Sequence, residues 1–180
     1  PERRPFYLIT TISEKAALIA QTGIDALIVI PFSLEFAKTT AGEFVNHILW
    51  DKLRIRKIII GHDYAFGRNK EGNEAFLTVH GKRLGFEVQV IHAFSIGDTV
   101  ISSTRVRNAL MAGEMRLASE WLGRPYSLAG TVVRGHQRGA GLGFPTANIQ
   151  SDKLPLPPDG VYAVIVRLDG NRFRGVLNIG

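Results

Sequence analysis

The sequence of 180 residues contains no cysteine. The chain therefore has no disulfide, no thiolate zinc site and no cysteine nucleophile, and it is compatible with a reducing cytoplasm, where we expect it to act. Long hydrophobic runs are also missing, because the longest, at 26–31 and 57–60, have the length of a strand rather than of a membrane span. We expect no membrane partner.

Runs of one charge sign are missing too, although the formal net charge is +6 and the pI is about 9.9. A basic surplus favours anionic partners, which include phosphorylated small molecules as well as nucleic acids. The scattered charges, and the lack of basic residues interleaved with aromatic ones on the predicted strands, argue against nucleic acid. We expect small-molecule phosphates as partners and no nucleic acid, and the sequence does not indicate an oligomeric state.

Helix-start signals recur along the first 123 residues. Thr11–Glu14 and Thr40–Glu43 each form a Thr-x-x-Glu capping box, which predicts a helix directly after it. Asn73 opens a third predicted helix, and Gly85 can end it, because glycine tolerates the left-handed conformation found at helix C-termini.

Apolar runs of strand length alternate with these helices. Residues 25–30 and 57–60 are continuous apolar runs, which predict strands buried on both faces of a sheet. Residues 86–91 predict a further strand. The alternation predicts an α/β module over residues 1–123, with a parallel sheet covered by helices.

Helix signals are missing after Gly123-Arg124-Pro125. Residues 124–180 instead contain short β-type runs separated by glycine and proline, at 128–134, 161–168 and 173–179. Asp169-Gly170-Asn171 between the last two runs predicts a tight hairpin turn. These patterns predict a second, all-β module that forms the opening half of a small antiparallel barrel.

The Gly-Lys-Ser/Thr ending of the common phosphate loop is missing, but another glycine-rich segment extends from Gly135 to Asn148. Its glycines allow backbone N–H groups to approach anionic oxygens closely. Thr146 and Asn148 lie two residues apart, so in an extended backbone their hydroxyl and amide leave the same face and offer neutral oxygen ligands to Mg²⁺. By composition alone, a plain surface loop between two strands is the alternative.

Acidic residues are missing from the start of the helix predicted near Ser103. The serines are natural N-caps, but the first turns carry Arg105 and Arg107, and no acidic residue occurs before Glu114. Arginines near a helix N-terminus oppose the helix dipole, so an anion bound there by N–H groups, hydroxyls and an arginine would be favourable. Arg107 shares a face with Ser103, whereas Arg105 points elsewhere. The spacing alone leaves an ordinary capped helix with solvated arginines as the alternative.

The strand predicted at 57–60 leads into Gly61-His62-Asp63. A loop at the carboxyl end of a parallel strand is where open α/β sheets bind ligands. The adjacent histidine and aspartate could form a catalytic pair or a metal site. Because no second cluster lies nearby in the sequence, we favour a role in shaping the turn and in ligand contacts.

Two of these segments resemble the nucleotidyltransferase superfamily that includes the adenylyltransferases. Residues 101–107 match its Ile-Ser-Ser-Thr-x-x-Arg signature, which holds the phosphates of ATP, and this implies ATP binding by Ser103, Thr104 and Arg107. Residues 61–67 match the loop that contacts flavin and nucleotide in the flavin-specific branch. The resemblance implies such contacts for Gly61, His62, Asp63, Tyr64, Phe66 and Gly67.

The segment from Gly135 to Asn148 is similar, residue for residue, to the phosphate loop and Pro-Thr-Ala-Asn motif of riboflavin kinases. This implies ATP binding by Gly135, Arg138, Gly139, Gly143, Thr146 and Asn148. The same resemblance implies Mg²⁺ binding by the last two.

Taken together, the motifs resemble the bifunctional prokaryotic riboflavin kinase/FAD synthetases over essentially the whole chain. The resemblance implies a Rossmann-like FMN adenylyltransferase module at 1–123 and the first part of a riboflavin kinase β-barrel at 124–180. It implies that ATP and Mg²⁺ serve the phosphorylation of riboflavin to FMN, and that FMN is adenylylated to FAD with release of pyrophosphate.

The resemblance also has gaps. The family's first strand and His-x-Gly-His loop are not found in this sequence, and we expect the catalytic glutamate of the kinase beyond residue 180, so no catalytic residue is assigned. A protein that retains only one of the two activities, and a regulator that binds flavin or nucleotide without chemistry, remain alternatives.

Overall fold

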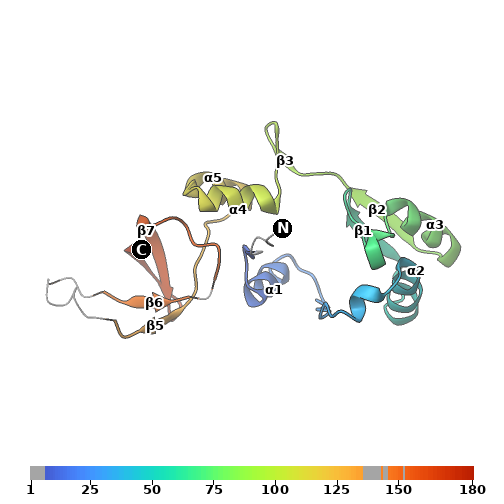
Figure 1. The fold of residues 1–180 in the computed structure, drawn as a ribbon, viewed down its shortest axis with the longest axis horizontal. Helices are drawn as coiled ribbons and strands as arrows, with labels where there is room; N and C mark the ends of the chain where they lie inside the picture. The colour runs from blue at the N-terminus through green and yellow to red at the C-terminus, as the bar shows by residue number, and fades with distance from the viewer. Residues whose placement is uncertain (1–6, 136–142, 144–145, 152) are drawn as a thin grey trace. The chain divides into compact units, whose positions relative to one another are not determined.

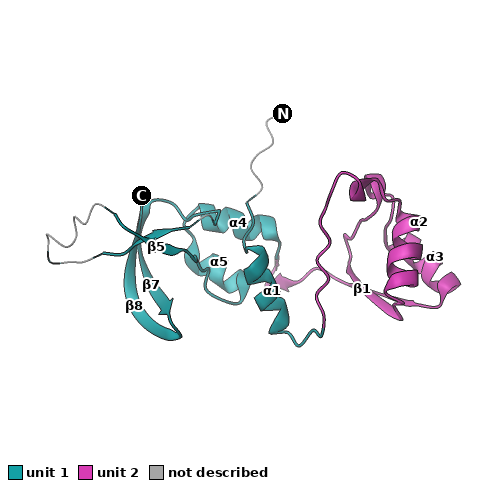
Figure 2. Cartoon of the chain, turned by 90° about the horizontal axis from the view of Figure 1, so that it is seen from below, with its two compact units in different colours: residues 1–25, 101–180 teal, residues 26–100 magenta. Residues whose placement is uncertain are grey.

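A computed structural model describes residues 7–135, 143, 146–151 and 153–180 (Figure 1). The chain divides into two compact units, one formed by residues 1–25 and 101–180 and the other by residues 26–100 (Figure 2). Residue 123, after which the sequence predicts a module boundary, lies inside the first unit. In the described part of the chain, no helix has the length and hydrophobicity needed to cross a bilayer.

The unit of residues 26–100 is built on a parallel strand pair joined by a helix. In chain order its elements are η1 (Phe36–Lys38), α2 (Ala41–Glu43), η2 (Phe44–Lys52), β1 (Lys57–Gly61), η3 (Arg68–Lys70), α3 (Glu74–Leu84), β2 (Glu87–Ile91), β3 (Ser95–Ile96) and β4 (Thr99–Val100). Strand β1 runs parallel to β2, with Lys57 opposite Glu87 and Gly61 opposite Ile91. The predicted β–α–β alternation is confirmed here.

The helix boundaries of this unit follow the sequence signals. The Asn73 side chain accepts the Phe76 N–H at 3.0 Å at the start of α3, and Gly85 ends that helix with a φ of 89°. The capping box of Thr40 and Glu43 starts α2, which continues as the π-helical segment η2. Helices and strands enclose one core, whose buried members are Ala41, Val45, Leu49, Ile60, Phe66, Leu77 and Phe86.

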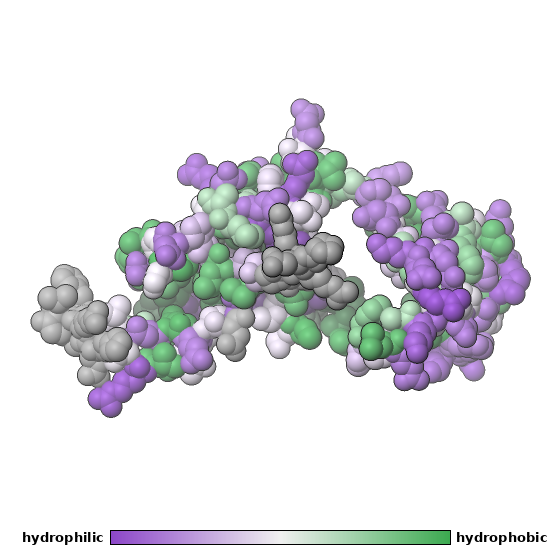
Figure 3. All heavy atoms as spheres, in the orientation of Figure 1, coloured by the Kyte–Doolittle hydropathy of each residue, from purple (hydrophilic) through white to green (hydrophobic). Residues whose placement is uncertain are grey.

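Two expectations about strands are wrong. Residues 26–30 form no strand, and Ile28 and Val29 are 59% and 61% exposed, because no strand in the described part of the chain pairs with this run. Strand β1 is not buried on both faces: Ile58 and Ile60 face the core, but Ile59 is 57% exposed, since the packed residues cover only one face. Figure 3 shows hydrophobic residues at the surface beside hydrophilic ones.

The other unit combines helices and antiparallel strand pairs. Its elements are α1 (Ile12–Ala20), α4 (Ser103–Met111), α5 (Met115–Leu122), β5 (Thr131–Val133), β6 (Asn148–Gln150), β7 (Gly160–Leu168) and β8 (Asn171–Ile179). The capping box of Thr11 and Glu14 starts α1, as predicted. Helices α4 and α5 share a core of Val106, Ala109, Leu110 and Ala118.

The all-β prediction for the end of the chain is confirmed as two antiparallel pairs, β5 with β6 and β7 with β8. Asp169 and Gly170, with φ of 48° and 80°, connect β7 to β8 and bring Leu168 opposite Asn171. Positive φ at both central residues is the conformation that suits a two-residue hairpin turn. Strand β5 is shorter than the predicted run 128–134, and the described strands do not close into a barrel.

The acid stability of this unit depends on Glu14. Burial opposes ionisation of its carboxyl, but hydrogen bonds from Lys153 and from the Thr11 N–H outweigh burial and lower the pKa of Glu14 from 4.5. A carboxyl whose pKa is lowered by folding stabilises the folded state above its unfolded pKa, and this contribution is lost as the pH falls through the folded pKa. We expect the difference in unfolding free energy between wild type and Glu14→Gln to be constant near neutral pH and to shrink below about pH 4.5. Urea unfolding across this range measures it, and a pH-independent difference contradicts the assignment.

Candidate functional site

The loop of residues 61–67 follows the carboxyl end of β1, as predicted. The His62 N–H donates to the Ile91 carbonyl at 3.0 Å, which ties the start of the loop to the end of β2. A Cβ on Gly61 would lie 3.3 Å from the Asp63 Oδ1, so the carboxylate turns back over the strand end. His62 and Asp63 are both exposed and accessible to a ligand.

Phe66 and Gly67 shape this loop from the inside. Phe66 is 8% exposed and belongs to the core, and its backbone exchanges two hydrogen bonds with Gly72, at 3.0 and 2.9 Å. A Cβ on Gly67, whose φ is 74°, would lie 2.6 Å from the Ala41 nitrogen, so glycine is required. Tyr64 stacks on Phe66 with ring centroids 5.5 Å apart, and burial raises the pKa of Tyr64. The accessible polar side chains of the loop are therefore His62, Asp63 and Tyr64.

The start of α4 lies in the other unit. Ser102 is the N-cap, and its hydroxyl accepts the Arg105 N–H at 3.3 Å, while Ser103 and Thr104 are exposed in the first turn. No acidic residue lies in that turn. A helix N-terminus that combines exposed hydroxyls with positive charge suits an anion.

The two arginines of α4 have different surroundings. Arg107 is half-buried and its Nε donates to the Tyr7 carbonyl at 2.6 Å, whereas Arg105 is exposed. This contact anchors the guanidinium of Arg107 to the chain that precedes α1. The different exposures agree with the predicted helix phase, in which the two side chains leave different faces.

The β5–β6 pair brings two predicted ATP-binding residues together. Asn148 begins β6 opposite Val133, and its side-chain amide lies directly over Gly135, where an added Cβ would be 2.7 Å from the Asn148 Cγ. Glycine at 135 is therefore required for the amide to hold this position. Thr146 and Asn148 are exposed, and Gly143 has a φ of 81°, a conformation that favours glycine. Arg138 and Gly139 lie outside the described residues.

The candidate metal ligands at this site are neutral oxygens. Among the described residues, no group of three or more His, Cys, Asp and Glu side chains gathers in one place. The hydroxyl of Thr146 and the amide of Asn148 offer the hard, neutral ligands that suit Mg²⁺ when phosphates supply the negative charge. Both side chains are exposed, so they fit an ion that also keeps phosphate and water ligands.

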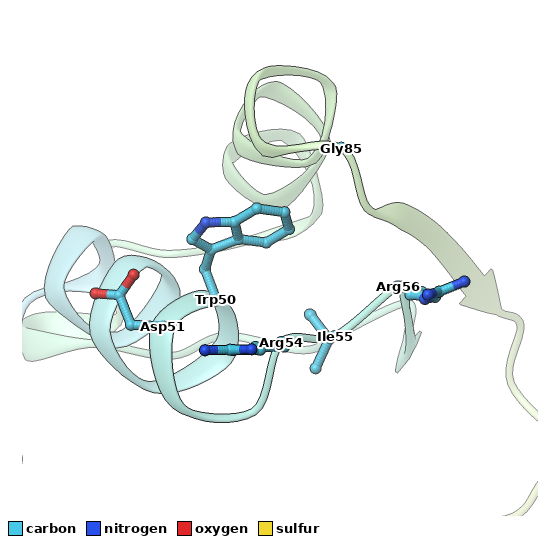
Figure 4. Close-up of a pocket in the computed structure, with 6 residues that line it drawn as sticks. All are labelled: Trp50, Asp51, Arg54, Ile55, Arg56 and Gly85. Atoms are coloured by element: carbon cyan, nitrogen blue, oxygen red, sulfur yellow. The ribbon is translucent and has the colours of Figure 1, made fainter.

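A separate hollow lies within the unit of residues 26–100, and none of residues 61–67 lines it. It measures about 840 Å³ and is lined by Trp50, Asp51, Arg54, Ile55, Arg56 and Gly85 (Figure 4). Arg54 and Arg56 point in different directions and do not converge on one ligand position (Figure 4). The hollow lies where the chain enters β1, whereas the 61–67 loop leaves the opposite, carboxyl end of that strand. We therefore do not assign it to the site.

Comparisons with known proteins relate these segments to two sequence families. The sequence model of the FAD synthetase family matches residues 1–105. The chain belongs to the FAD synthetase family. The sequence model of riboflavin kinase matches residues 122–180, so both patterns occur in one polypeptide.

Several curated relatives carry the name bifunctional riboflavin kinase/FMN adenylyltransferase. The chain is 37% identical to the protein of Pseudomonas fluorescens, covering 100% of this chain and 60% of the relative. It is 39% identical to the Haemophilus influenzae protein, covering 93% and 54%, and 36% identical to that of Escherichia coli K12, covering 96% and 55%. The chain thus spans little more than half the length of these relatives.

A solved structure has the same fold. The crystal structure of a protein described as a macrolide-efflux protein from Streptococcus pneumoniae matches with a TM-score of 0.88 at 31% sequence identity, covering 98% of this chain and 59% of that one. Its description names a function different from that of the curated relatives. One fold can carry unrelated functions. This likeness therefore supports the fold, and the function has to be inferred from the site residues.

Buried Lys153 and the partly buried Glu14 and Tyr126 form a polar cluster that the sequence does not predict. The sequence pattern predicts only a capping-box role for Glu14, and no sequence signal links it to a lysine 139 residues away. Lys153 does lie in an alternating pattern with Pro155 and Pro157, all three of which are buried. That alternation was the available signal for an inward-facing lysine.

Proposed function

We propose that the chain is part of a bifunctional enzyme of FAD biosynthesis that acts in the cytoplasm on riboflavin, FMN and ATP. The observation that carries the proposal is the succession of FAD synthetase and riboflavin kinase patterns in one polypeptide, over residues 1–105 and 122–180. In this proposal residues 1–123 belong to a Rossmann-like adenylyltransferase module. Residues 124–180 form part of a riboflavin kinase barrel.

In the adenylyltransferase reaction, a phosphate oxygen of FMN attacks the α-phosphorus of ATP, and pyrophosphate leaves as FAD forms. Ser103, Thr104 and Arg107 hold the β- and γ-phosphates at the start of α4, where donors and positive charge stabilise the leaving pyrophosphate. His62, Asp63 and Tyr64 contact flavin and nucleotide. Gly61, Phe66 and Gly67 shape the loop that presents them.

In the kinase reaction, the ribityl 5′-hydroxyl of riboflavin attacks the γ-phosphorus of ATP, and ADP leaves as FMN forms. Gly135, Arg138, Gly139 and Gly143 shape the phosphate loop, and Asn148 is held against Gly135 so that its amide faces the nucleotide. Thr146 and Asn148 would hold Mg²⁺, which neutralises phosphate charge when bound. Positioning and charge neutralisation supply most of the barrier reduction in phosphoryl transfer.

Product analysis of the full-length protein tests the function. Incubated with riboflavin, ATP and Mg²⁺, it is expected to form FMN and then FAD, and incubated with FMN it is expected to form FAD and pyrophosphate. Removal of Mg²⁺ with a chelator should stop riboflavin phosphorylation, because the bound ion would neutralise the charge of the phosphates during transfer. Formation of only one product would restrict the proposal to one activity, and formation of neither would refute it.

A further inference from the structure

Lys153 is the one charged residue that is buried in the described part of the chain, with 5% of its surface exposed. Its Nζ donates to Glu14 Oε1 at 2.9 Å, to Glu14 Oε2 at 2.7 Å and to the Ser127 carbonyl at 2.6 Å. It also lies 4.6 Å from the centroid of the Tyr126 ring. A buried ammonium needs such partners, because an unpaired charge is costly in the interior. These contacts define the position of Lys153 closely.

The ion pair between Lys153 and Glu14 connects the segment matched by the FAD synthetase model to the segment matched by the riboflavin kinase model. Glu14 lies on α1, within the residues matched by FAD synthetase, whereas Lys153 and Ser127 lie within those matched by riboflavin kinase. The carboxylate of Glu14 also accepts the Thr11 N–H at 2.9 Å, which completes the capping box of α1. One carboxylate therefore fixes both the start of α1 and the ammonium of Lys153.

The same lysine anchors the chain that leaves β6. The Ser151 hydroxyl donates to the Ala129 carbonyl at 2.7 Å and accepts the Lys153 N–H at 3.3 Å. The Tyr126 hydroxyl donates to the Pro155 carbonyl at 2.8 Å. The segment 151–155 is thus tied to 126–129 immediately beside the β5–β6 pair. Asn148 lies at the other end of β6, against Gly135.

We propose that Lys153 is a positioning residue of the kinase site, which together with Glu14 of α1 fixes the β5–β6 pair so that Asn148 faces the nucleotide. This role rests on the proposed riboflavin kinase function. Phosphoryl transfer is sensitive to such positioning, because a displacement of about 1 Å in a remote support can cost on the order of 100-fold in rate. Riboflavin phosphorylation therefore depends on a side chain from the FAD synthetase half of the chain.

A double variant separates positioning from stability. Lys153→Met alone leaves Glu14 without its partner and is expected to lower stability, whereas Glu14→Gln with Lys153→Met removes both charges and should recover much of that loss. The full-length variants are assayed for thermal unfolding, for riboflavin phosphorylation with kcat and KM for ATP, and for FMN adenylylation. Lys15→Met, an exposed lysine on α1, is the matched control.

For the double variant we expect kinase kcat per folded molecule to fall by about tenfold or more, with KM for ATP changed less and adenylylation within about twofold of wild type. Recovery of the kinase rate together with stability would overturn the positioning role and leave Lys153 a purely structural residue. A wild-type protein that does not phosphorylate riboflavin would overturn the proposed function, and this role with it. The wild-type assay therefore distinguishes the two failures.

Discussion

Arg107→Ala in the full-length protein is expected to lower FAD formation from FMN by on the order of 100-fold, the scale of losing one charge-assisted contact to the transition state. Arg107 lies one turn into α4, above exposed Ser103 and Thr104, at a helix start without acidic residues. Riboflavin phosphorylation should stay near normal, because its ATP is proposed to bind elsewhere, at the β5–β6 pair. Both turnovers are measured on the same purified protein.

Arg105→Ala is the matched control for this prediction. Arg105 is on the same helix and is exposed, so its loss removes one positive charge without removing the proposed contact. We expect only a mild effect, and equal losses from both substitutions would show that the assigned face of α4 is wrong. Arg107 also donates to the Tyr7 carbonyl. If that contact is its whole role, the variant loses thermal stability while the folded fraction forms FAD at the wild-type rate.

Local sequence signals predicted the element boundaries well. Capping boxes, the N-cap at Asn73, the glycine at 85 and the Asp169–Gly170 turn each specify backbone hydrogen bonds or φ values within a few residues. Such signals do not depend on the rest of the fold. This is why the helices, the parallel pair and the hairpin could be predicted from the sequence.

Features that depend on distant partners could not be predicted in this way. The apolar run 25–30 carries a strand pattern, but a strand requires a neighbour to accept its backbone hydrogen bonds, and the described chain provides none there. The exposure of Ile59 depends on which face of β1 the helices cover. The pairing of Lys153 with Glu14 depends on packing between segments 139 residues apart.

The candidate site shows the same division. The motif around Asn148 was readable, but its contact with Gly135 follows from the register of β5 and β6, which places Val133 opposite Asn148. Similarly, the sequence grouped Phe66 with His62 as ligand contacts, whereas burial shows that Phe66 supports the loop from the core. Residue types predict a ligand-binding chemistry, whereas burial shows which side chains are accessible and which support the loop from the core.

Gly135→Ala offers an independent approach to the role of Asn148. An added Cβ would overlap the Asn148 amide, so the amide must move although its chemistry is unchanged. If Asn148 acts through its position, Gly135→Ala and Asn148→Ala should impair the same reaction. Asn171→Ala, which removes an exposed asparagine at the turn of the β7–β8 hairpin, is the control expected to leave both turnovers unchanged.

Asn148→Ala itself is expected to lower riboflavin-to-FMN turnover by more than tenfold and to shift the Mg²⁺ requirement, while FMN-to-FAD turnover persists. The substitution removes an oxygen ligand from an exposed position but keeps the backbone pairing of β6 with β5. If Asn148 serves only to pack against the loop, the variant loses thermal stability, keeps its ATP affinity at saturating Mg²⁺, and phosphorylates riboflavin normally per folded molecule. A normal kinase rate per folded molecule would therefore remove Asn148 from the metal and nucleotide site, whereas a selective loss that higher Mg²⁺ partly restores would place it there.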